Sequence, residues 1–216
     1  TLYVQERDEA GNWSASGSYA VTIDATVPTV TITSGASSNT NTSPIPVTIT
    51  FSESVTGFDV GDITVGNGTA GSFVAVSGTE YTADITPSAD GAVTVDVAAN
   101  VAQDAAGNNN TAATQLNRTY DNTAPTVTIT SAVPTNTNTS PISVTITFSE
   151  SVTGFVIGDI TVGNGTAGNF VTVSGTEYTA DITPSGQGAV TVDVAANVAQ
   201  DAAGNNNTAA TVTIEA

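Results

Sequence analysis

The sequence of 216 residues contains no cysteine, no histidine and no methionine. Its only two basic residues are Arg7 and Arg118, so lysine is absent as well. The missing cysteine and histidine exclude disulfides, thiol catalysis, structural zinc, haem ligation and acid–base catalysis by histidine. The missing lysine excludes Schiff-base chemistry and phosphate binding by a P-loop.

Positive charge is nearly absent, because 20 acidic residues face 2 basic ones and give a formal net charge of −18. This balance excludes a basic surface for nucleic acid and disfavours an anionic membrane surface as a partner. No run of about 18 apolar residues occurs, so the sequence predicts no membrane insertion. Hard-cation binding by oxygen ligands is the main site chemistry that remains.

The residues that are present form an internal repeat. Residues 24–114 match residues 121–211 closely, so the repeat is about 97 residues long. Solenoid repeats are about 20–50 residues long, whereas one immunoglobulin-like sandwich takes about 100. A fragment at 8–12 also matches 104–108 and 201–205. The sequence therefore predicts the C-terminal strands of a preceding repeat at 1–23 and two full repeats at 24–120 and 121–216.

Within each repeat, apolar and polar residues alternate with a period of two, as from Ile45 to Phe51. Such alternation is typical of strands with one buried face, and no helical period occurs. Turn signals such as Asn67-Gly68 separate the runs. We predict about seven strands in the first repeat, a number typical of such domains, near 29–33, 45–51, 62–65, 72–77, 80–86, 92–98 and 111–119. The predicted fold is all-β, with tandem immunoglobulin-like antiparallel β-sandwiches.

The last strand of the first repeat carries one residue more than its counterpart in the second. At the positions after Asn108 that correspond to inward apolar residues in the other copies, this strand has polar residues. A shift of one residue restores apolar side chains there. A slip of one residue turns every side chain to the other face, so we expect a bulge or a longer loop between 108 and 116. We expect Leu116 and Tyr120 to face inward, Gln115 and Asn117 to face solvent, and Arg118 to reach a carboxylate or the domain junction.

The topology of an immunoglobulin-like sandwich predicts where the acidic residues meet. Its N-terminus lies at the same end as the loops after the second and sixth strands. Carboxylates and an asparagine oxygen converging there suit Ca²⁺, which takes six to eight oxygen ligands, better than Mg²⁺. The predicted calcium ligands are Asp8 and Asn12 in the fragment, Asp24, Glu53, Asp104 and Asn108 in the first repeat, and Asp121, Glu150, Asp201 and Asn205 in the second.

Other interpretations of these acidic residues stay open. Aspartate and asparagine near glycine also form tight turns without an ion, so the loop at 104–108 has a second interpretation as a turn only. Asp62 and Asp159 could ligate the ion or cap a loop through backbone amides. Paired carboxylates could serve a glycosidase, but near-identical tandem copies argue against an enzyme.

The segments at 51–58, 62–65 and 67–68 (FSESVTGF, DITV and NG) resemble the bacterial Ig-like domain family. The Asp-x-Ala-Gly-Asn loop and the Asp-x-Thr-x-Pro linker at 121–125 fit the same family, whereas the linker at 24–28 keeps only its aspartate, threonine and proline. The resemblance covers both repeats and the N-terminal fragment. It implies tandem arrays in large secreted or surface-anchored bacterial proteins, including adhesins, that act as stalks, often stiffened by calcium, without enzymatic activity.

We therefore expect an extracellular or cell-surface spacer whose junctions calcium makes rigid. Its partners are the neighbouring repeats of the same chain, with a cell-surface glycan or protein as a further candidate. The alternative is a glycan- or partner-binding module, or an assembly module that forms a surface sheath or filament. The repeats differ only modestly, at 35–38, 59–60 and 89–90. This near-identity favours the spacer, since a binding face is usually elaborated in one copy.

Overall fold

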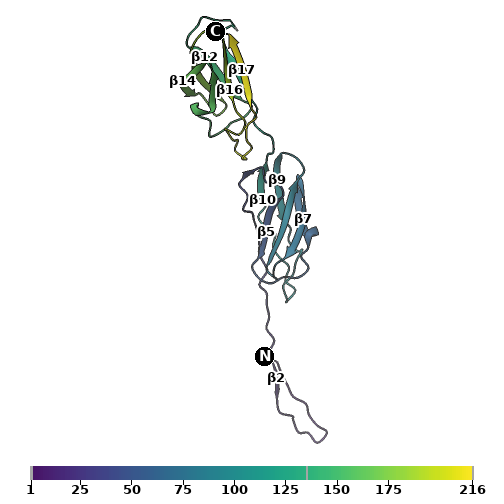
Figure 1. Ribbon diagram of the computed structural model, residues 1–216. Helices are drawn as coiled ribbons and strands as arrows, with labels where there is room; N and C mark the ends of the chain where they lie inside the picture. Colours follow the sequence, from purple (N-terminus) through teal and green to yellow (C-terminus); the bar gives the residue numbers. More distant parts are fainter. Residues whose placement is uncertain (1, 135, 216) are drawn as a thin grey trace.

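The computed structural model describes residues 2–134 and 136–215. Two β-sandwiches lie end to end, and an extended N-terminal hairpin precedes them (Figure 1). The hairpin pairs β1 (Leu2–Val4) antiparallel with β2 (Gly17–Tyr19), and both strands are exposed. Within the described ranges, no helix has the length and apolar character needed to cross a membrane.

Two sheets form the first sandwich. One has the order β3 (Val30–Thr33), β5 (Ile45–Phe51), β8 (Glu80–Pro87) and β7 (Gly68–Ala75), with antiparallel pairs throughout. The other has the order β4 (Asn39–Thr40), β10 (Leu116–Tyr120), β9 (Gly91–Val97) and β6 (Ile63–Gly66). In this second sheet, β4 pairs parallel with β10. A 3₁₀ turn, η1 (Val60–Asp62), precedes β6.

The second sandwich repeats this plan. Its first sheet has the order β11 (Val127–Ser131), β12 (Ile142–Phe148), β15 (Glu177–Pro184) and β14 (Gly165–Thr172). Its second sheet has the order β13 (Ile160–Gly163), β16 (Ala189–Val194) and β17 (Ala210–Glu215), with the 3₁₀ turn η2 (Ile157–Asp159) before β13. The predicted all-β fold of tandem antiparallel sandwiches is confirmed.

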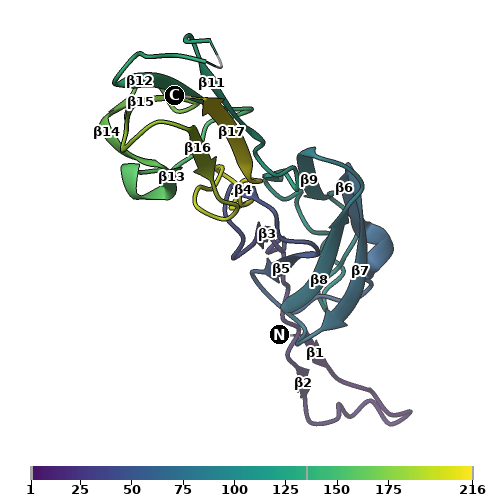
Figure 2. The ribbon, with the colours of Figure 1, turned by 45° about the horizontal axis from the view of Figure 1, so that its top comes forward.

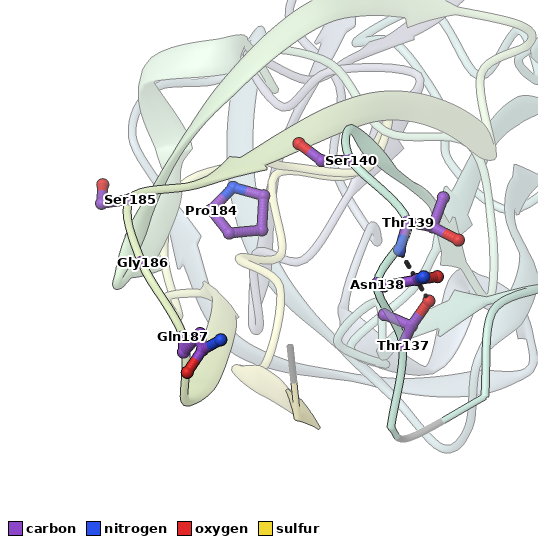
Figure 3. A pocket seen from close by; sticks show the side chains of 8 residues that line it. All are labelled: Thr137, Asn138, Thr139, Ser140, Pro184, Ser185, Gly186 and Gln187. Atoms are coloured by element: carbon purple, nitrogen blue, oxygen red, sulfur yellow. Dashed lines mark hydrogen bonds between the residues drawn. The ribbon is translucent and has the colours of Figure 1, made fainter.

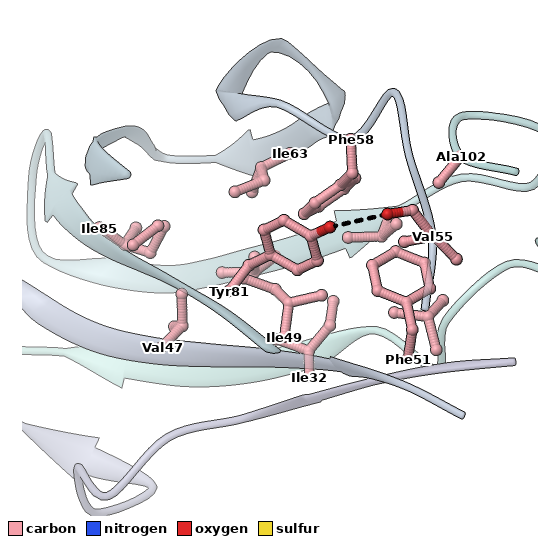
Figure 4. Packing of buried hydrophobic residues seen from close by; sticks show 14 of the residues in the cluster. Ile32, Val47, Ile49, Phe51, Val55, Phe58, Ile63, Tyr81, Ile85 and Ala102 are labelled. Carbon is pink, nitrogen blue, oxygen red and sulfur yellow. Dashed lines mark hydrogen bonds between the residues drawn. The ribbon is translucent and has the colours of Figure 1, made fainter. Parts of the chain in front are cut away.

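The predicted alternation positions the core between the sheets. Along β5, the apolar residues of the run Ile45–Phe51 are buried and the polar ones between them face outward. The rings of Phe51 and Phe58 meet edge to face at a centroid distance of 5.1 Å, beside Tyr81 (Figure 4). The Tyr81 hydroxyl donates to the carbonyl of Val55 at 3.3 Å. Each fully buried side chain of this size contributes about 1.5–3 kcal/mol, so apolar packing is a large stabilising contribution in a sandwich that has no disulfide.

The predicted bounds of three segments were wrong. Strand β7 begins at Gly68 and not at residue 72, because Asn67, with a φ of 56°, reverses the chain at once. Strand β4 lies between the predicted strands at 29–33 and 45–51, where no strand was predicted. Strand β10 begins at Leu116 and not at residue 111.

The late start of β10 follows from the extra residue. Val95 pairs with Leu116 in the first repeat, whereas its counterpart Val192 pairs with Val212 in the second. The ladder upstream is unshifted, because the N–H of residue 113 still donates to the carbonyl of residue 97 at 2.9 Å. The predicted irregularity is therefore confirmed and lies between residues 113 and 116.

The side chains of β10 face the predicted directions. Leu116 and Tyr120 pack against the core, and Gln115 and Asn117 are exposed. Arg118 was expected to reach a carboxylate or the domain junction, and within the described residues it makes no hydrogen bond to a carboxylate. Its guanidinium instead donates to backbone carbonyls of the loop after β3, at 3.0 Å to residue 36 and 3.2 Å to residue 34. These carbonyls satisfy a half-buried group that has donors only.

We expect deletion of Thr114 to be tolerated, because it removes the extra residue and leaves Leu116 opposite Val95. The loss in free energy of unfolding should stay below about 1 kcal/mol, as for other changes away from the core. Deleting Thr211, its counterpart in the second repeat, should instead turn the buried Ile214 outward and cost about 2–3 kcal/mol. Thermal melting of both variants tests this, and equal losses would contradict the register.

Candidate cation site at the end of each sandwich

A loop after β16 holds the first carboxylate of the candidate site. Oδ1 of Asp201 accepts the backbone N–H groups of residues 203, 204 and 205 at 2.8, 2.7 and 2.9 Å. Gly204 has a φ of 95°, which glycine adopts without a steric penalty. Asp201 is only 6% exposed, and these bonds stabilise its buried carboxylate and hold it in one position. The loop at 104–108 repeats the design, with N–H bonds at 2.8 Å to Oδ1 of Asp104.

A buried asparagine supports each of these loops from below. Asn207 is 2% exposed, and its Oδ1 accepts the N–H groups of residues 198 and 199, both at 2.9 Å. Its Nδ2 donates to the carbonyls of residues 195 and 208 at 2.9 and 2.7 Å. All its donors and acceptors are therefore used. Asn110 does the same in the first repeat. Neither residue was predicted from the sequence, although the repeated runs of asparagine at 108–110 and 205–207 are a signal.

Three elements bring three carboxylates together at the end of each sandwich. Asp121 belongs to the linker, Glu150 follows β12, and Asp201 follows β16. Their carboxylate oxygens lie within 4.8 Å of one another. The equivalent group in the first repeat is Asp24, Glu53 and Asp104. The structure thus brings together the six carboxylates that the sequence predicted for the two full repeats.

The two predicted asparagines brace these groups through their nitrogen atoms. Nδ2 of Asn205 donates to Oδ2 of Asp201 and to the backbone carbonyl of Asp121, both at 2.9 Å. In the first repeat, Nδ2 of Asn108 donates to Asp104 at 2.8 Å and to the carbonyl of Asp24 at 3.2 Å. Each asparagine therefore ties the loop to the linker. Its role as an oxygen ligand stays a prediction.

The charges of the three carboxylates act on one another. Burial raises the pKa of Glu150, and the charges of Asp121 and Asp201 raise it further. The same causes raise the pKa of Glu53 in the first repeat. The bond from Asn108 lowers the pKa of Asp104, because it stabilises the charged form. Hydrogen bonds thus favour the charged form of Asp104, whereas burial and like charge together make ionisation of Glu53 and Glu150 unfavourable.

Neither arginine donates a hydrogen bond to these carboxylates in the described part of the chain. Arg118 lies on β10 and donates to backbone carbonyls. Arg7 lies in the N-terminal fragment, donates to the carbonyl of Gly11 at 3.1 Å and stacks over Trp13. With no other basic residue in the sequence, the protein provides these carboxylates with no hydrogen-bonded cation.

The N-terminal fragment contains the loop but not the full group. The N–H of Asn12 donates to Oδ1 of Asp8 at 2.8 Å, and its Nδ2 donates to Oδ2 at 3.1 Å. These bonds lower the pKa of Asp8. Neither group of three carboxylates includes Asp8. The fragment therefore presents the turn alone.

The second site lies at the contact between the two sandwiches. The N–H of Asn41 donates to the carbonyl of Ala203 at 3.2 Å. Its Nδ2 donates to Oδ1 of Asn205 at 3.1 Å. Figure 2 shows β4, which precedes Asn41, beside the loops of the second sandwich. Asp121 is accordingly half-buried, whereas its counterpart Asp24 is exposed.

Asp90 of the first sandwich holds the linker as well. Its Oδ1 accepts the N–H of Asn122 at 2.9 Å, and its Oδ2 accepts the hydroxyl of Thr123 at 2.6 Å. These bonds lower the pKa of Asp90. The sequence analysis assigned no role to Asp90 or Asn41. The signal for Asp90 is that the repeats differ there, since Gln187 stands at the equivalent position.

Asp62 and Asp159 act as loop caps. Oδ2 of Asp62 accepts the N–H of Asp59 at 2.9 Å, and Oδ2 of Asp159 accepts the N–H of Val156 at 2.8 Å. Neither belongs to a group of three carboxylates. Of the two interpretations left open, the structure supports capping.

Comparisons with known proteins identify the repeats. A family model described as a bacterial Ig-like domain matches residues 24–120 and again residues 121–216. No curated protein matches the chain significantly.

Several solved structures resemble the chain. InvD of Yersinia pseudotuberculosis is 17% identical, with a TM-score of 0.36 over 87% of this chain and 57% of that one. The adhesin InvE of the same organism is 16% identical, with a TM-score of 0.30 over 88% and 59%. The N-terminal part of the bacterial S-layer protein SbsC is 17% identical, with a TM-score of 0.32 over 88% and 44%. The chain spans about half the length of these structures.

We expect Glu150→Gln to raise the free energy of unfolding in chelator at pH 7 by about 0.5 kcal/mol, the scale of a surface charge interaction. The folded state raises the pKa of Glu150, so its charge costs stability at neutral pH. That cost disappears below the ordinary glutamate value of 4.5, where both states bind the proton.

Denaturant titrations at pH 7 and about pH 3.5 test the sign, with the gain from glutamine vanishing in acid. Glu177→Gln, on a strand of the same repeat, is the matched control. The same gain at both pH values would contradict repulsion as its cause.

Proposed function

Because the chain belongs to the bacterial Ig-like domain family, we propose that it is an extracellular spacer whose junctions are made rigid by Ca²⁺. The observation that carries the proposal is the group of Asp121, Glu150 and Asp201 at the contact between the sandwiches. The linker, the loop after β12 and the loop after β16 each contribute one of these residues. An ion bound by all three would therefore tie the linker to the second sandwich at two places.

The donor set fits calcium. Calcium takes six to eight oxygen ligands at 2.3–2.6 Å and tolerates irregular geometry, whereas Mg²⁺ demands a near-ideal octahedron and retains water. Asp121, Glu150 and Asp201 offer carboxylate oxygens within 4.8 Å of one another. Backbone carbonyls or water would complete the shell. The equivalent residues of the first repeat would hold a second ion.

The proposed mechanism is electrostatic. Without a cation, the three carboxylates repel one another, and this repulsion weakens the hold of Asn205 and Asp90 on the linker that carries Asp121. With calcium, this repulsion becomes attraction to a shared ion, and the linker is held. Extracellular modules bind calcium with dissociation constants of about 10⁻⁴–10⁻³ M, which suits an exported protein. The same groups recur in both repeats, so we assign them to ion binding and not to catalysis.

Lateral assembly into a sheath or filament is the second candidate, favoured by exposed valines on edge strands. Val74 in β7 and Val76 just after it are 53% and 56% exposed, and Val171 in β14 and Val173 just after it are 51% and 56% exposed. The bulges in β7 and β14 disfavour direct edge pairing. Sedimentation at high concentration distinguishes the two functions, because a spacer stays monomeric.

We expect calcium at about 10–30 times its dissociation constant to stabilise the folded chain by about 1–2 kcal/mol per site. The melting midpoint should rise by about 5–15 °C over its value in EDTA. The double variant Glu53→Gln, Glu150→Gln should melt higher than the wild type in EDTA, because repulsion is gone, and should gain little from calcium. The same concentration of magnesium is the control. An unchanged wild-type midpoint would contradict the proposal.

Rigidity of the junction is tested by spin labels, which the chain accepts cleanly because it has no cysteine. The labels replace Thr86 and Thr183, equivalent exposed positions on β8 and β15. We expect calcium to narrow the distribution of distances between them and Glu150→Gln to abolish the narrowing. Glu53→Gln is the matched control, since its site lies at the far end of the first sandwich. Equal effects of the two variants would contradict an ion acting at this junction.

A further inference from the structure

The free end of the second sandwich carries a polar depression of about 230 Å³ (Figure 3). Its walls are the segments 137–140 and 184–187. They contain no charged residue. They are the counterparts of residues 40–43 and 87–90 in the first sandwich, which include Asn41 and Asp90. On the second sandwich, the depression therefore occupies the position that is equivalent to the contact surface of the first sandwich.

Both walls are built alike in the two sandwiches. On one wall, the N–H of Thr139 donates to the hydroxyl of Thr137 at 3.1 Å, and Asn138 lies between them (Figure 3). In the first sandwich, residues 42 and 40 make the same bond at 3.0 Å around Asn41. The turn that presents Asn41 to the second sandwich is thus repeated at Asn138.

The opposite wall is held by an asparagine of the preceding turn. Nδ2 of Asn164 donates to the carbonyl of Gly186 at 3.1 Å, and its own carbonyl accepts the N–H of Ser185 at 2.9 Å. Asn67 makes the equivalent bonds to residues 89 and 88 at 2.9 and 3.1 Å. The depression is therefore a built copy of an occupied surface.

We propose that this depression is the seat for the Asp-Ala-Ala-Gly-Asn loop of a further Ig-like repeat, with Asn138 as its anchor. The occupied counterpart defines the contacts. The N–H of Asn138 donates to the carbonyl of the loop's second alanine, and its Nδ2 donates to Oδ1 of the loop's asparagine, as Asn41 does to Ala203 and Asn205.

One difference sets the strength of this second junction. Asp90 accepts two hydrogen bonds from the linker, one at each carboxylate oxygen. Gln187, its counterpart, has a single acceptor oxygen. The second junction is therefore held less tightly than the first. The inference rests on the spacer function proposed above but not on the cation, since these contacts are direct hydrogen bonds.

The test uses the full chain extended after Ala216 by a second copy of residues 121–216. Spin labels replace Thr183 and the equivalent threonine of the added copy, and distances are measured in EDTA and in calcium. We expect a defined distance in both conditions, and Asn138→Ala should at least double the width of its distribution. Gln187→Asp should narrow it. Asn41→Ala in the same chain is the matched control, because it acts on the first junction only.

The outcomes separate this inference from the cation site. A distribution in EDTA as broad as that of Asn138→Ala, or one that Asn138→Ala leaves unchanged, would overturn the seat. A narrow distribution that calcium does not affect would support the seat and contradict the calcium function. Because Asn138 is exposed, Asn138→Ala should keep its melting midpoint, which checks that the variant folds.

Discussion

Three carboxylates lie within 4.8 Å of one another at the base of each sandwich, and hydrogen bonds hold the loop carboxylate in place against their mutual repulsion. Asp201 is held by three backbone N–H groups and by Asn205, and Asn207 fixes the loop beneath it. Burial raises the pKa of Glu150, and the charges of Asp121 and Asp201 raise it further. The folded protein thus already holds the three carboxylates close together in spite of their mutual repulsion.

Two kinds of force act at the junction between the sandwiches. The bonds from Asn41 to the loop at 203–205 and from Asp90 to the linker are short-range, so they define one relative orientation. Asp121, Glu150 and Asp201 repel one another, and in the proposed function this repulsion is replaced by attraction to a shared cation. Direct bonds thus select the geometry of the junction, and in the proposed function the ion determines how firmly it is kept.

The repeats are nearly identical in sequence, yet their ends are not equivalent in the structure. Asn205, which contacts the first sandwich, is 8% exposed, whereas its counterpart Asn108 is half-buried. The group at the first sandwich includes Asp24, which belongs to the linker that follows the N-terminal hairpin. The linker aspartate and the asparagine are therefore more buried in the second repeat than in the first, because their burial depends on the neighbouring sandwich.

The sequence by itself determined the repeat, the all-β fold and the inward phase of strands such as β5 and β10, because a period of two specifies which side chains are buried. It also predicted that Asp121, Glu150 and Asp201 converge, since the topology of the sandwich places their segments at one end. The tertiary structure alone decided the roles of Asn41 and Asp90, whose contacts lie across a junction. It also decided that Asn205 presents its nitrogen to Asp201 and its oxygen to Asn41. No local pattern encodes such contacts, because they depend on how two folded surfaces meet.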